Sequence, residues 1–252
     1  MKIVLVTGGT GFIGRHLQKL KSEWIYVSSD DYSLTNINET RQMYEDIRPD
    51  AVIHLAARVG GIDLFYGPPA KTNFSYGYSK RLLHVLVSSY RKQYKVNYST
   101  FCPSNVYGPG DNFNSEKSHF VASLVSKAAS LGTDEDLELW GTGKPLRQQL
   151  YVGDLCEIMT ILLDKHNSEM PLIVAPNENL SVDTMTRILM SLMNKENKVI
   201  YNGLLEGQHR KDGSNKELLN LIGDFKFTSF SEGIMKVINS YNEQRELCKK
   251  NQ

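Results

Sequence analysis

The sequence lacks several features that would direct it to other classes of protein. Only three cysteines, Cys102, Cys156 and Cys248, occur in 252 residues, and their spacing matches no metal site. We therefore expect reduced thiols in a cytoplasmic compartment rather than a disulfide framework or a zinc centre. No apolar run approaches the roughly 20 residues of a membrane-spanning helix. The first residues already have the pattern of a strand, which leaves no place for a secretory signal.

An excess of charge of one sign is also missing. The chain has 29 Lys and Arg against 28 Asp and Glu, a net charge of +1. This balance favours neither nucleic acid nor a membrane surface as a partner. The sequence shows no internal repeats and no low-complexity linker. Its length allows one α/β core and a smaller second lobe.

The most informative stretch that is present runs from Thr7 to Gly14. It follows the apolar run 3–6 and precedes a helical pattern of apolar residues. Gly8 permits a tight turn, Gly11 lets backbone N–H groups approach a pyrophosphate, and Gly14 lets the helix lie close to the strand. This context favours dinucleotide binding over a merely structural turn. The residues expected to hold the cofactor here are Gly8, Gly9, Thr10, Gly11, Phe12, Ile13 and Gly14.

Strands and helices alternate along the chain. The strands are predicted over 2–6, 24–27, 51–55, 98–102 and 137–140. The helices are predicted over 11–21, 38–47, 74–94, 119–131, 154–163, 182–193 (capped by Ser181) and 230–246, with a loop over 103–110. The alternation predicts an α/β fold with a doubly wound parallel sheet, whose ligand lies beyond the carboxyl ends of the strands. We expect a dinucleotide-binding domain over 1–115 and mainly a substrate-binding lobe over 116–252, with 148–165 returning to the core.

Tyr76 and Lys80 lie one helical turn apart on the same face of the predicted helix. An ammonium group near a phenol lowers the phenol pKa from its usual value near 10. The phenol then becomes a workable proton donor to a carbonyl that is being reduced by hydride. By itself such a pair is usually a solvated helix face. Its combination with the glycine turn, in this chain order, favours catalysis.

Taken together, these motifs resemble the extended short-chain dehydrogenase/reductases, within the NAD-dependent epimerase/dehydratase family. The segments that carry the resemblance are 4–14, 54–61, 67–69, 76–81, 105–113, 140–147 and 225–228. The resemblance implies a Rossmann-type sheet with a smaller C-terminal α/β lobe. It also implies a multifunctional NADP(H)-dependent enzyme that converts GDP-4-keto-6-deoxy-D-mannose to GDP-L-fucose. Epimerisation at C3 and C5 through enols would precede hydride delivery to C4.

The resemblance assigns catalytic roles to three residues. Tyr76 would protonate the substrate oxygen at C4, while Lys80 would tune Tyr76 and hold the nicotinamide ribose. His119 would be the general acid for epimerisation, which suits an imidazole near neutral pH. From the sequence alone, His119 is also read as a solvent-facing residue at a helix N-terminus. The residues implied to lie along the nicotinamide are Pro103, Ser104, Asn105 and Val106, together with Lys80 and His119.

The resemblance also implies a site for the GDP-sugar. The residues that match are Lys127, Trp140, Arg147 and Glu206. Arg147 can clamp a phosphate with two hydrogen bonds, and Trp140 can offer an aromatic face. Without the resemblance, Trp140 would be read as a core residue and Lys127 as a surface residue.

The chain departs from the family between Leu55 and Tyr76, where it has only the 20 residues Ala56–Ser75. Family members place a helix and a strand here, which need about 30 residues or more. That strand carries a serine and a cysteine of the epimerisation site, and none of the three cysteines present replaces them by position. Three explanations of the short segment are open. The given chain lacks residues between Ile62 and Asp63 that the native protein has, or the gene product is truncated and poorly active, or the shorter chain forms the epimerisation site from other residues. We expect a homodimer if the native chain has the helix.

The choice of dinucleotide depends on the end of the second predicted strand. Asp30 lies there, and a carboxylate accepts a hydrogen bond from a free ribose 2′-hydroxyl but repels a 2′-phosphate. Ser28, Ser29 and Arg15 could still receive the phosphate. The resemblance implies NADP, and NAD stays open.

Two other functions remain open at this point. The first is another nucleotide-sugar epimerase, reductase or 4,6-dehydratase on the same scaffold. The second is a catalytically impaired nucleotide-sugar-binding homologue, which the missing serine and cysteine favour.

Overall fold

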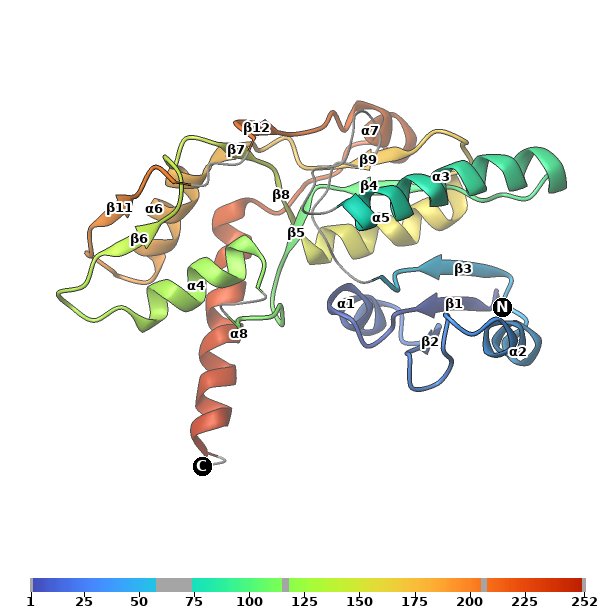
Figure 1. The fold of residues 1–252 in the computed structure, drawn as a ribbon, viewed down its shortest axis with the longest axis horizontal. Helices are drawn as coiled ribbons and strands as arrows, with labels where there is room; N and C mark the ends of the chain where they lie inside the picture. The colour runs from blue at the N-terminus through green and yellow to red at the C-terminus, as the bar shows by residue number, and fades with distance from the viewer. Residues whose placement is uncertain (1, 58–73, 115–117, 205–207, 251–252) are drawn as a thin grey trace. The chain divides into compact units, whose positions relative to one another are not determined.

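The computed structural model describes residues 2–57, 74–114, 118–204 and 208–250, without the side chains of 74–76 (Figure 1). The chain forms two compact units. One comprises Met1–Cys102 and Cys156–Leu172, and the other comprises Pro103–Leu155 and Ile173–Gln252. The predicted boundary at 115 and the return of 148–165 to the core stay predictions.

A three-stranded parallel sheet forms the centre of the first unit. Its order is β2 (Ile25–Val27), β1 (Val4–Thr7) and β3 (Ala51–His54). All four residues of β1 are buried, as the apolar run 3–6 predicts for a central strand. The helices α1 (Phe12–Leu20) and α2 (Ile37–Ile47) follow β1 and β2, and Leu5, Val27 and Met43 form a shared core cluster. These strands and helices alternate as the sequence predicts.

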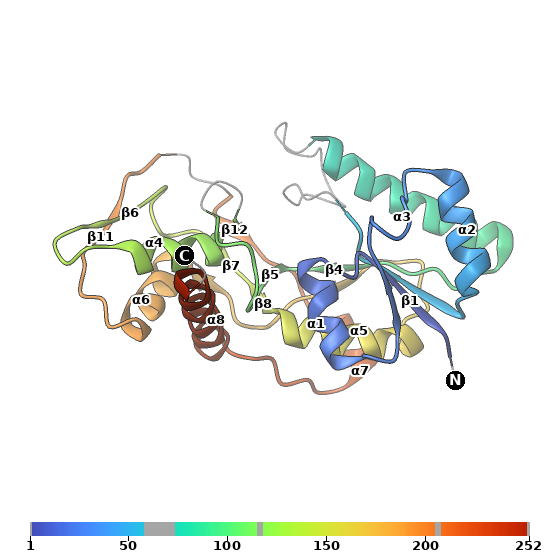
Figure 2. The same cartoon turned by 90° about the horizontal axis from the view of Figure 1, so that it is seen from below.

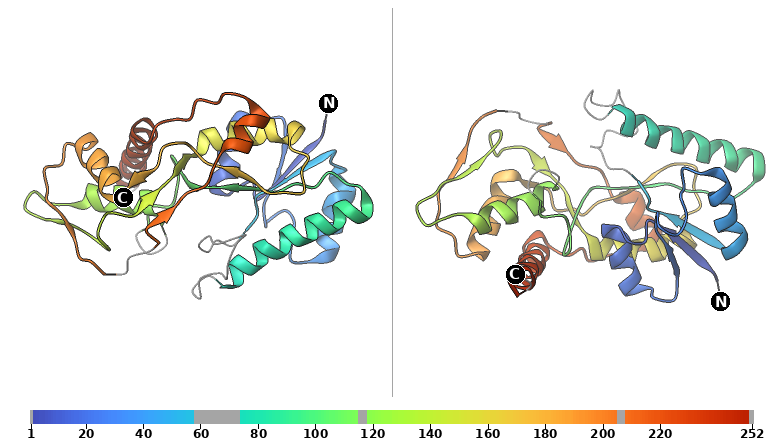
Figure 3. Two further views of the ribbon diagram at one scale, coloured as in Figure 1. Left: turned by 90° about the horizontal axis from the view of Figure 1, so that it is seen from above. Right: turned by 60° about the horizontal axis from the view of Figure 1, so that its bottom comes forward.

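The first unit continues with α3 (Phe74–Tyr94), a 21-residue helix that runs along one side of the unit in both views of Figure 3. The strand predicted over 98–102 lies instead at β4 (Phe101–Pro103) and pairs with β9 (Leu172–Val174). The helix predicted over 154–163 extends to α5 (Val152–Lys165).

The second unit contains short strands and four described helices, three of which pack together. β5 (Asn105–Tyr107) pairs in parallel with β8 (Gln149–Tyr151), and β6 (Leu137–Leu139) with β11 (Val199–Tyr201). β7 (Leu146–Arg147) lies between β10 (Leu180–Ser181) and β12 (Arg210–Lys211). The helices are α4 (Phe120–Ser130), α6 (Val182–Leu192), α7 (Lys216–Ile222) and α8 (Phe230–Lys250).

The core of the second unit lies where α4, α6 and α8 meet. Figure 2 shows α8 nearly end-on beside α4 and α6. Leu124, Val125, Leu189 and Ile234 are each at most 1% exposed in this core. Ser181 caps α6 as predicted, because its hydroxyl oxygen accepts a hydrogen bond of 3.0 Å from the Thr184 N–H.

The predicted loop 103–110 is wrong in part, because it contains β5. Val106 and Tyr107 are paired with Leu150 and Tyr151 of β8. The ring of Tyr107 packs in edge-to-face and tilted contacts with Tyr151 and Phe230 and is 1% exposed. A partner strand more than 40 residues away in the sequence therefore decides the conformation of this segment.

Candidate functional site

The glycine turn after β1 has a geometry that other residues could not adopt. Gly8 has φ of +75°, and a Cβ added there would lie 2.8 Å from the backbone nitrogen of Ala56. A Cβ on Gly14 would lie 2.5 Å from the carbonyl oxygen of Gly9. The Gly9 N–H donates to the Val27 carbonyl at 2.9 Å, and the Gly11 N–H donates to the Gly8 carbonyl at 3.0 Å. The turn is therefore closed on itself and bonded to the end of β2.

The start of α1 is prepared for an anion. Its N-cap is Gly11, no side chain caps it, and its first turn contains no acidic residue. The predicted cofactor residues Phe12 and Ile13 are its first helical residues, and Thr10 precedes the cap. The first N–H groups of a helix have no partners within the helix and lie at the positive end of its dipole. This turn therefore fits the diphosphate of a dinucleotide.

The loop after β2 contains two carboxylates, those of Asp30 and Asp31. Asp31 accepts hydrogen bonds of 2.8 Å from both the backbone N–H and the hydroxyl of Ser28. These bonds lower the pKa of Asp31. Arg15 donates to the Thr10 carbonyl at 2.7 Å. Two of the groups expected to receive a 2′-phosphate, Ser28 and Arg15, therefore already make hydrogen bonds within the protein.

Lys80 lies near the carboxyl ends of β1 and β3. Its ammonium acts on His54, the last residue of β3, and contributes to a lowered His54 pKa, of which burial is the larger cause. The His54 Nδ1 lies 2.8 Å from the hydroxyl oxygen of Thr7, the last residue of β1. Burial also lowers the pKa of Lys80 itself. Tyr76 is in α3, one turn before Lys80, but its side chain lies outside the described residues.

The residues predicted to lie along the nicotinamide fall on β4, β5 and the residue between them. Pro103 ends β4, while Asn105 and Val106 begin β5. The Ser104 N–H donates to the Val174 carbonyl at 2.9 Å, and the Asn105 side-chain amide donates to the Gln148 carbonyl at 3.3 Å. The Ser104 hydroxyl oxygen is buried and has no hydrogen-bond partner in the described part of the chain. A polar group of a ligand would satisfy this hydroxyl.

His119 is the N-cap residue of α4 and contacts a buried carboxylate. Its Nδ1 lies 3.3 Å from both oxygens of Asp111. The side chain of His119 is 55% exposed and that of Asp111 is 4% exposed. The hydrogen bond to Asp111 raises the pKa of His119, against the effect of burial. His119 therefore lies at a helix N-terminus with an exposed side chain, as the alternative interpretation predicted. It also contacts an anionic partner.

The predicted substrate residues lie in the second unit. Trp140 is 67% exposed, so its alternative reading as a core residue is wrong. The ammonium of Lys127, a surface residue, lies 6.0 Å from the centre of the Trp140 ring. Arg147 is half-buried, donates to the Leu146 carbonyl at 2.7 Å, and has a pKa lowered by burial. Glu206 lies outside the described residues.

Sequence reasoning missed several neighbours of these residues. Lys211 of β12 is in register with Arg147, which places a second cationic residue beside it. The buried side chain of Gln148 donates to the carbonyls of Pro176 and Gly213 and accepts from the Gly213 N–H. Asp111 lies in segment 105–113, which carries the family resemblance, but its contact with His119 was not predicted. These contacts depend on strand pairing and loop closure, which no local pattern announces.

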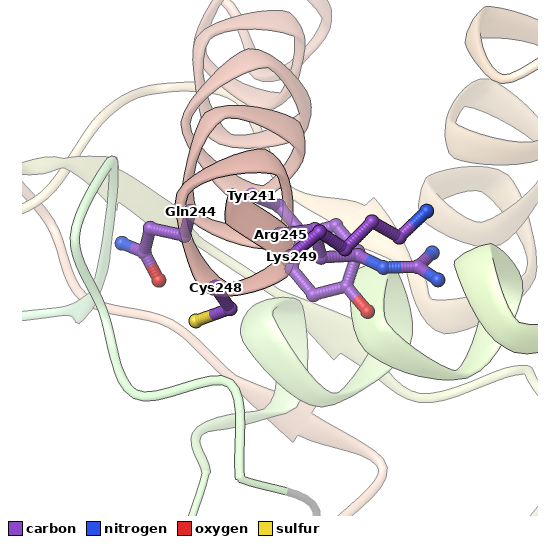
Figure 4. Close-up of a pocket in the computed structure, with 5 residues that line it drawn as sticks. All are labelled: Tyr241, Gln244, Arg245, Cys248 and Lys249. Carbon is purple, nitrogen blue, oxygen red and sulfur yellow. The ribbon is translucent and has the colours of Figure 1, made fainter. Parts of the chain in front are cut away.

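Two of the three cysteines are poor candidates for a base. Burial raises the pKa of Cys102 and of Cys156 to about 12, which keeps both thiols protonated at neutral pH. Cys248 is exposed on α8, in a pocket lined by Tyr241, Gln244, Arg245 and Lys249 of the same helix (Figure 4). None of these residues was predicted as a site residue.

Among the described residues, no group of three or more His, Cys, Asp or Glu could hold a metal ion. No described helix combines the length and the apolar character needed to cross a bilayer.

The parallel β2–β1–β3 sheet and the glycine turn define a Rossmann-type nucleotide-binding protein. The chain belongs to the NAD dependent epimerase/dehydratase family, whose model matches residues 4–70 and 63–174. It is similar to the GDP-L-fucose synthase of Dictyostelium discoideum, with 28% identity over 313 aligned positions that cover 99% of this chain and 98% of the relative. It is also similar to a probable GDP-L-fucose synthase of Drosophila melanogaster, with 28% identity over 327 positions that cover 99% and 100%.

Solved structures agree with this assignment. The NADP-bound GDP-L-fucose synthetase of Naegleria fowleri superimposes with a TM-score of 0.87 at 25% identity, covering 97% of this chain and 95% of that one. The predicted Rossmann-type fold and the predicted family are therefore confirmed. The two family matches overlap at residues 63–70, and both alignments are longer than the 252 residues of this chain. A helix–strand unit lost near 62–63 stays a prediction.

Proposed function

We propose that this protein is an NADPH-dependent epimerase and reductase that converts GDP-4-keto-6-deoxy-D-mannose to GDP-L-fucose. The observation that carries the reductase half is the position of Lys80. Its ammonium acts on His54, the last residue of β3, and the His54 ring contacts Thr7 at the end of β1, in the unit whose first loop is the glycine turn. Ligands of open parallel sheets bind beyond these strand ends.

The glycine turn would bind the diphosphate of the dinucleotide through the first N–H groups of α1. When bound, NADPH supplies a hydride for C4 of the sugar. The Naegleria relative is described as bound to NADP, which supports NADP here. Because Ser28 is already hydrogen-bonded to Asp31 and is not free to receive a 2′-phosphate, NAD is the alternative to test.

The protein's own groups would supply the protons. Tyr76 would protonate the C4 oxygen as hydride arrives, and Lys80 would keep that phenol acidic. His119 would return a proton to carbon during epimerisation. The exposed ring of Trp140, with Lys127 beside it, would bind the nucleotide, and Arg147 would bind a phosphate.

A second candidate is a nucleotide-sugar reductase that does not epimerise. Epimerisation at C3 and C5 requires a base to remove each proton, and the high pKa of Cys102 and Cys156 excludes their thiolates at neutral pH. The segment Ala56–Ser75 contains no cysteine. A cytoplasmic location and a homodimer remain predictions.

The test is to incubate the full chain with the keto sugar in D₂O, with and without NADPH. Deuterium entering at C3 and C5, followed by NADPH oxidation and release of GDP-L-fucose, would support the proposal. NADPH oxidation without deuterium uptake would favour the reductase. Binding of NADPH and GDP, seen by calorimetry, without either reaction would favour the impaired homologue.

The sugar nucleotide needs a separate measurement. A thermal-shift panel of GDP-, UDP- and dTDP-sugars at one concentration should show the largest stabilisation with the GDP-sugar, because a ligand that binds more tightly stabilises the folded state more. A larger shift with a UDP- or dTDP-sugar would move the assignment to another member of the family.

A further inference from the structure

The contact between His119 and Asp111 joins a buried group to an exposed one. Asp111 follows Gly110, whose φ is +75°, and the Gly110 N–H donates to the Ser240 hydroxyl at 3.2 Å. The Asp111 carboxylate accepts a 2.7 Å hydrogen bond from the Asn112 N–H. Within the described part of the chain, the carboxylate also contacts Nδ1 of His119, at 3.3 Å from each oxygen. The carboxylate is therefore held from the protein side while the imidazole reaches outward.

A buried carboxylate is costly unless hydrogen bonds and an opposite charge compensate it. Among the described residues, one backbone N–H and the imidazole supply this compensation for Asp111. The same pairing determines the chemistry of the ring. A histidine that donates its Nδ1–H to a carboxylate leaves Nε2 as the nitrogen that can exchange a proton with a ligand.

We propose that Asp111 is a positioning residue for His119: it fixes the imidazole at the start of α4 and retains the Nδ1 proton, so that Nε2 exchanges protons with the substrate. This inference rests on the proposed role of His119 as the general acid. It adds a residue to that site whose effect is exerted through His119.

The charges around His119 agree with its role as a general acid. Among the described residues, Asp111 is the charged group that acts on its pKa, through the hydrogen bond and through charge. A raised pKa keeps an exposed imidazole protonated at higher pH, as a general acid requires. A surface ion pair that only stabilised the loop would not need the carboxylate to be 4% exposed.

The first test is an NMR titration of His119 in the full chain without substrate. In the wild type we expect a pKa above the ordinary value of about 6.5. In Asp111→Asn the pKa should fall toward or below that value, because the charge is removed. In Asp134→Asn, an exposed aspartate of the same unit, it should not change.

The second test is the pH profile of turnover. The alkaline limb assigned to His119 should move to lower pH in Asp111→Asn, with a loss of about tenfold in kcat near that limb and little change in KM. Asp111→Glu keeps the charge and should retain a raised pKa.

An Asp111→Asn protein that folds and leaves the His119 pKa unchanged would overturn the proposal. So would a wild-type His119 that titrates at or below the ordinary value, even if neither variant folds. If the titration behaves as expected but the wild type has no turnover, the proposed function fails and the contact stands.

Discussion

Helices α3 and α4 carry similar apolar residues and bury them very differently. In α4, Val121, Leu124 and Val125 are 2%, 1% and 0% exposed, because α6 and α8 cover that face. In α3, Leu82, Val85 and Leu86 are 57%, 52% and 45% exposed. An amphipathic pattern therefore indicates a face that can be buried, but the rest of the fold decides whether it is.

The strands of the first unit show the same contrast. β1 is wholly buried between two neighbours, whereas Val52 of β3 is 36% exposed. β3 and α3 are separated by the segment in which the sequence predicts a departure from the family. The second unit has a continuous core around three helices, while α3 and the edge of β3 leave apolar surface in water.

The sharpest way to break this comparison is to truncate one leucine on each helix. Leu124→Ala should lower the free energy of unfolding by about 2–5 kcal/mol, because it opens a cavity in a filled core. Leu86→Ala should change it by less than about 1 kcal/mol, because the side chain is already half in water. Urea unfolding of both variants measures the difference. Equal losses would mean that α3 is covered in solution, and the contrast would be wrong.

The opposite face of α3 is tested through Lys80. Lys80→Met should lower reductase kcat about a hundredfold, because the phenol loses the charge that keeps it acidic. Lys92→Met, on the same helix and 70% exposed beside Glu169, is the matched control and should have little effect. Stopped-flow oxidation of NADPH gives the rates. Similar rates in both variants would remove Lys80 from the mechanism.

Trp140 offers a smaller effect in the second unit. Trp140→Ala should weaken GDP binding about tenfold, because an aromatic face is lost. It should leave the melting temperature nearly unchanged, because the ring is exposed and fills no core. Calorimetry with GDP and a thermal melt measure the two quantities. Unchanged affinity would exclude the ring from the nucleotide site.

The smallest expected effect is a difference in pKa between one histidine of each unit, His54 and His119. The pKa of His54 is lowered by burial and by Lys80, and that of His119 is raised by Asp111. His54 therefore contributes stability that is present above its unfolded pKa, near 6.5, and lost as pH falls through its folded value. His119 contributes stability that is present below about 6.5 and lost as pH rises through its folded value. NMR titration should place His54 below His119, and the reverse order would contradict both environments.

The sequence predicts the parts of the site that depend on neighbouring residues. The turn at Gly8 and Gly14, the cap at Ser181 and the α1 and α2 helices are local features, and the structure has them. β5 was missed because its conformation depends on β8. The exposure of Trp140 and the contact of Asp111 with His119 depend on tertiary packing, which residue type does not reveal. The roles of Tyr76 and Glu206 stay predictions.

The uncapped start of α1 has a consequence beyond recognition. A serine or aspartate at the N-cap often satisfies the first amide hydrogens of a helix, whereas Gly11 at the N-cap of α1 has no side chain to do so and leaves them available to an anion. A dinucleotide would then complete a secondary-structure element as well as enter a binding cleft. Protein deprived of it should melt earlier and be digested faster, so the cellular supply of coenzyme would also set how long each molecule survives.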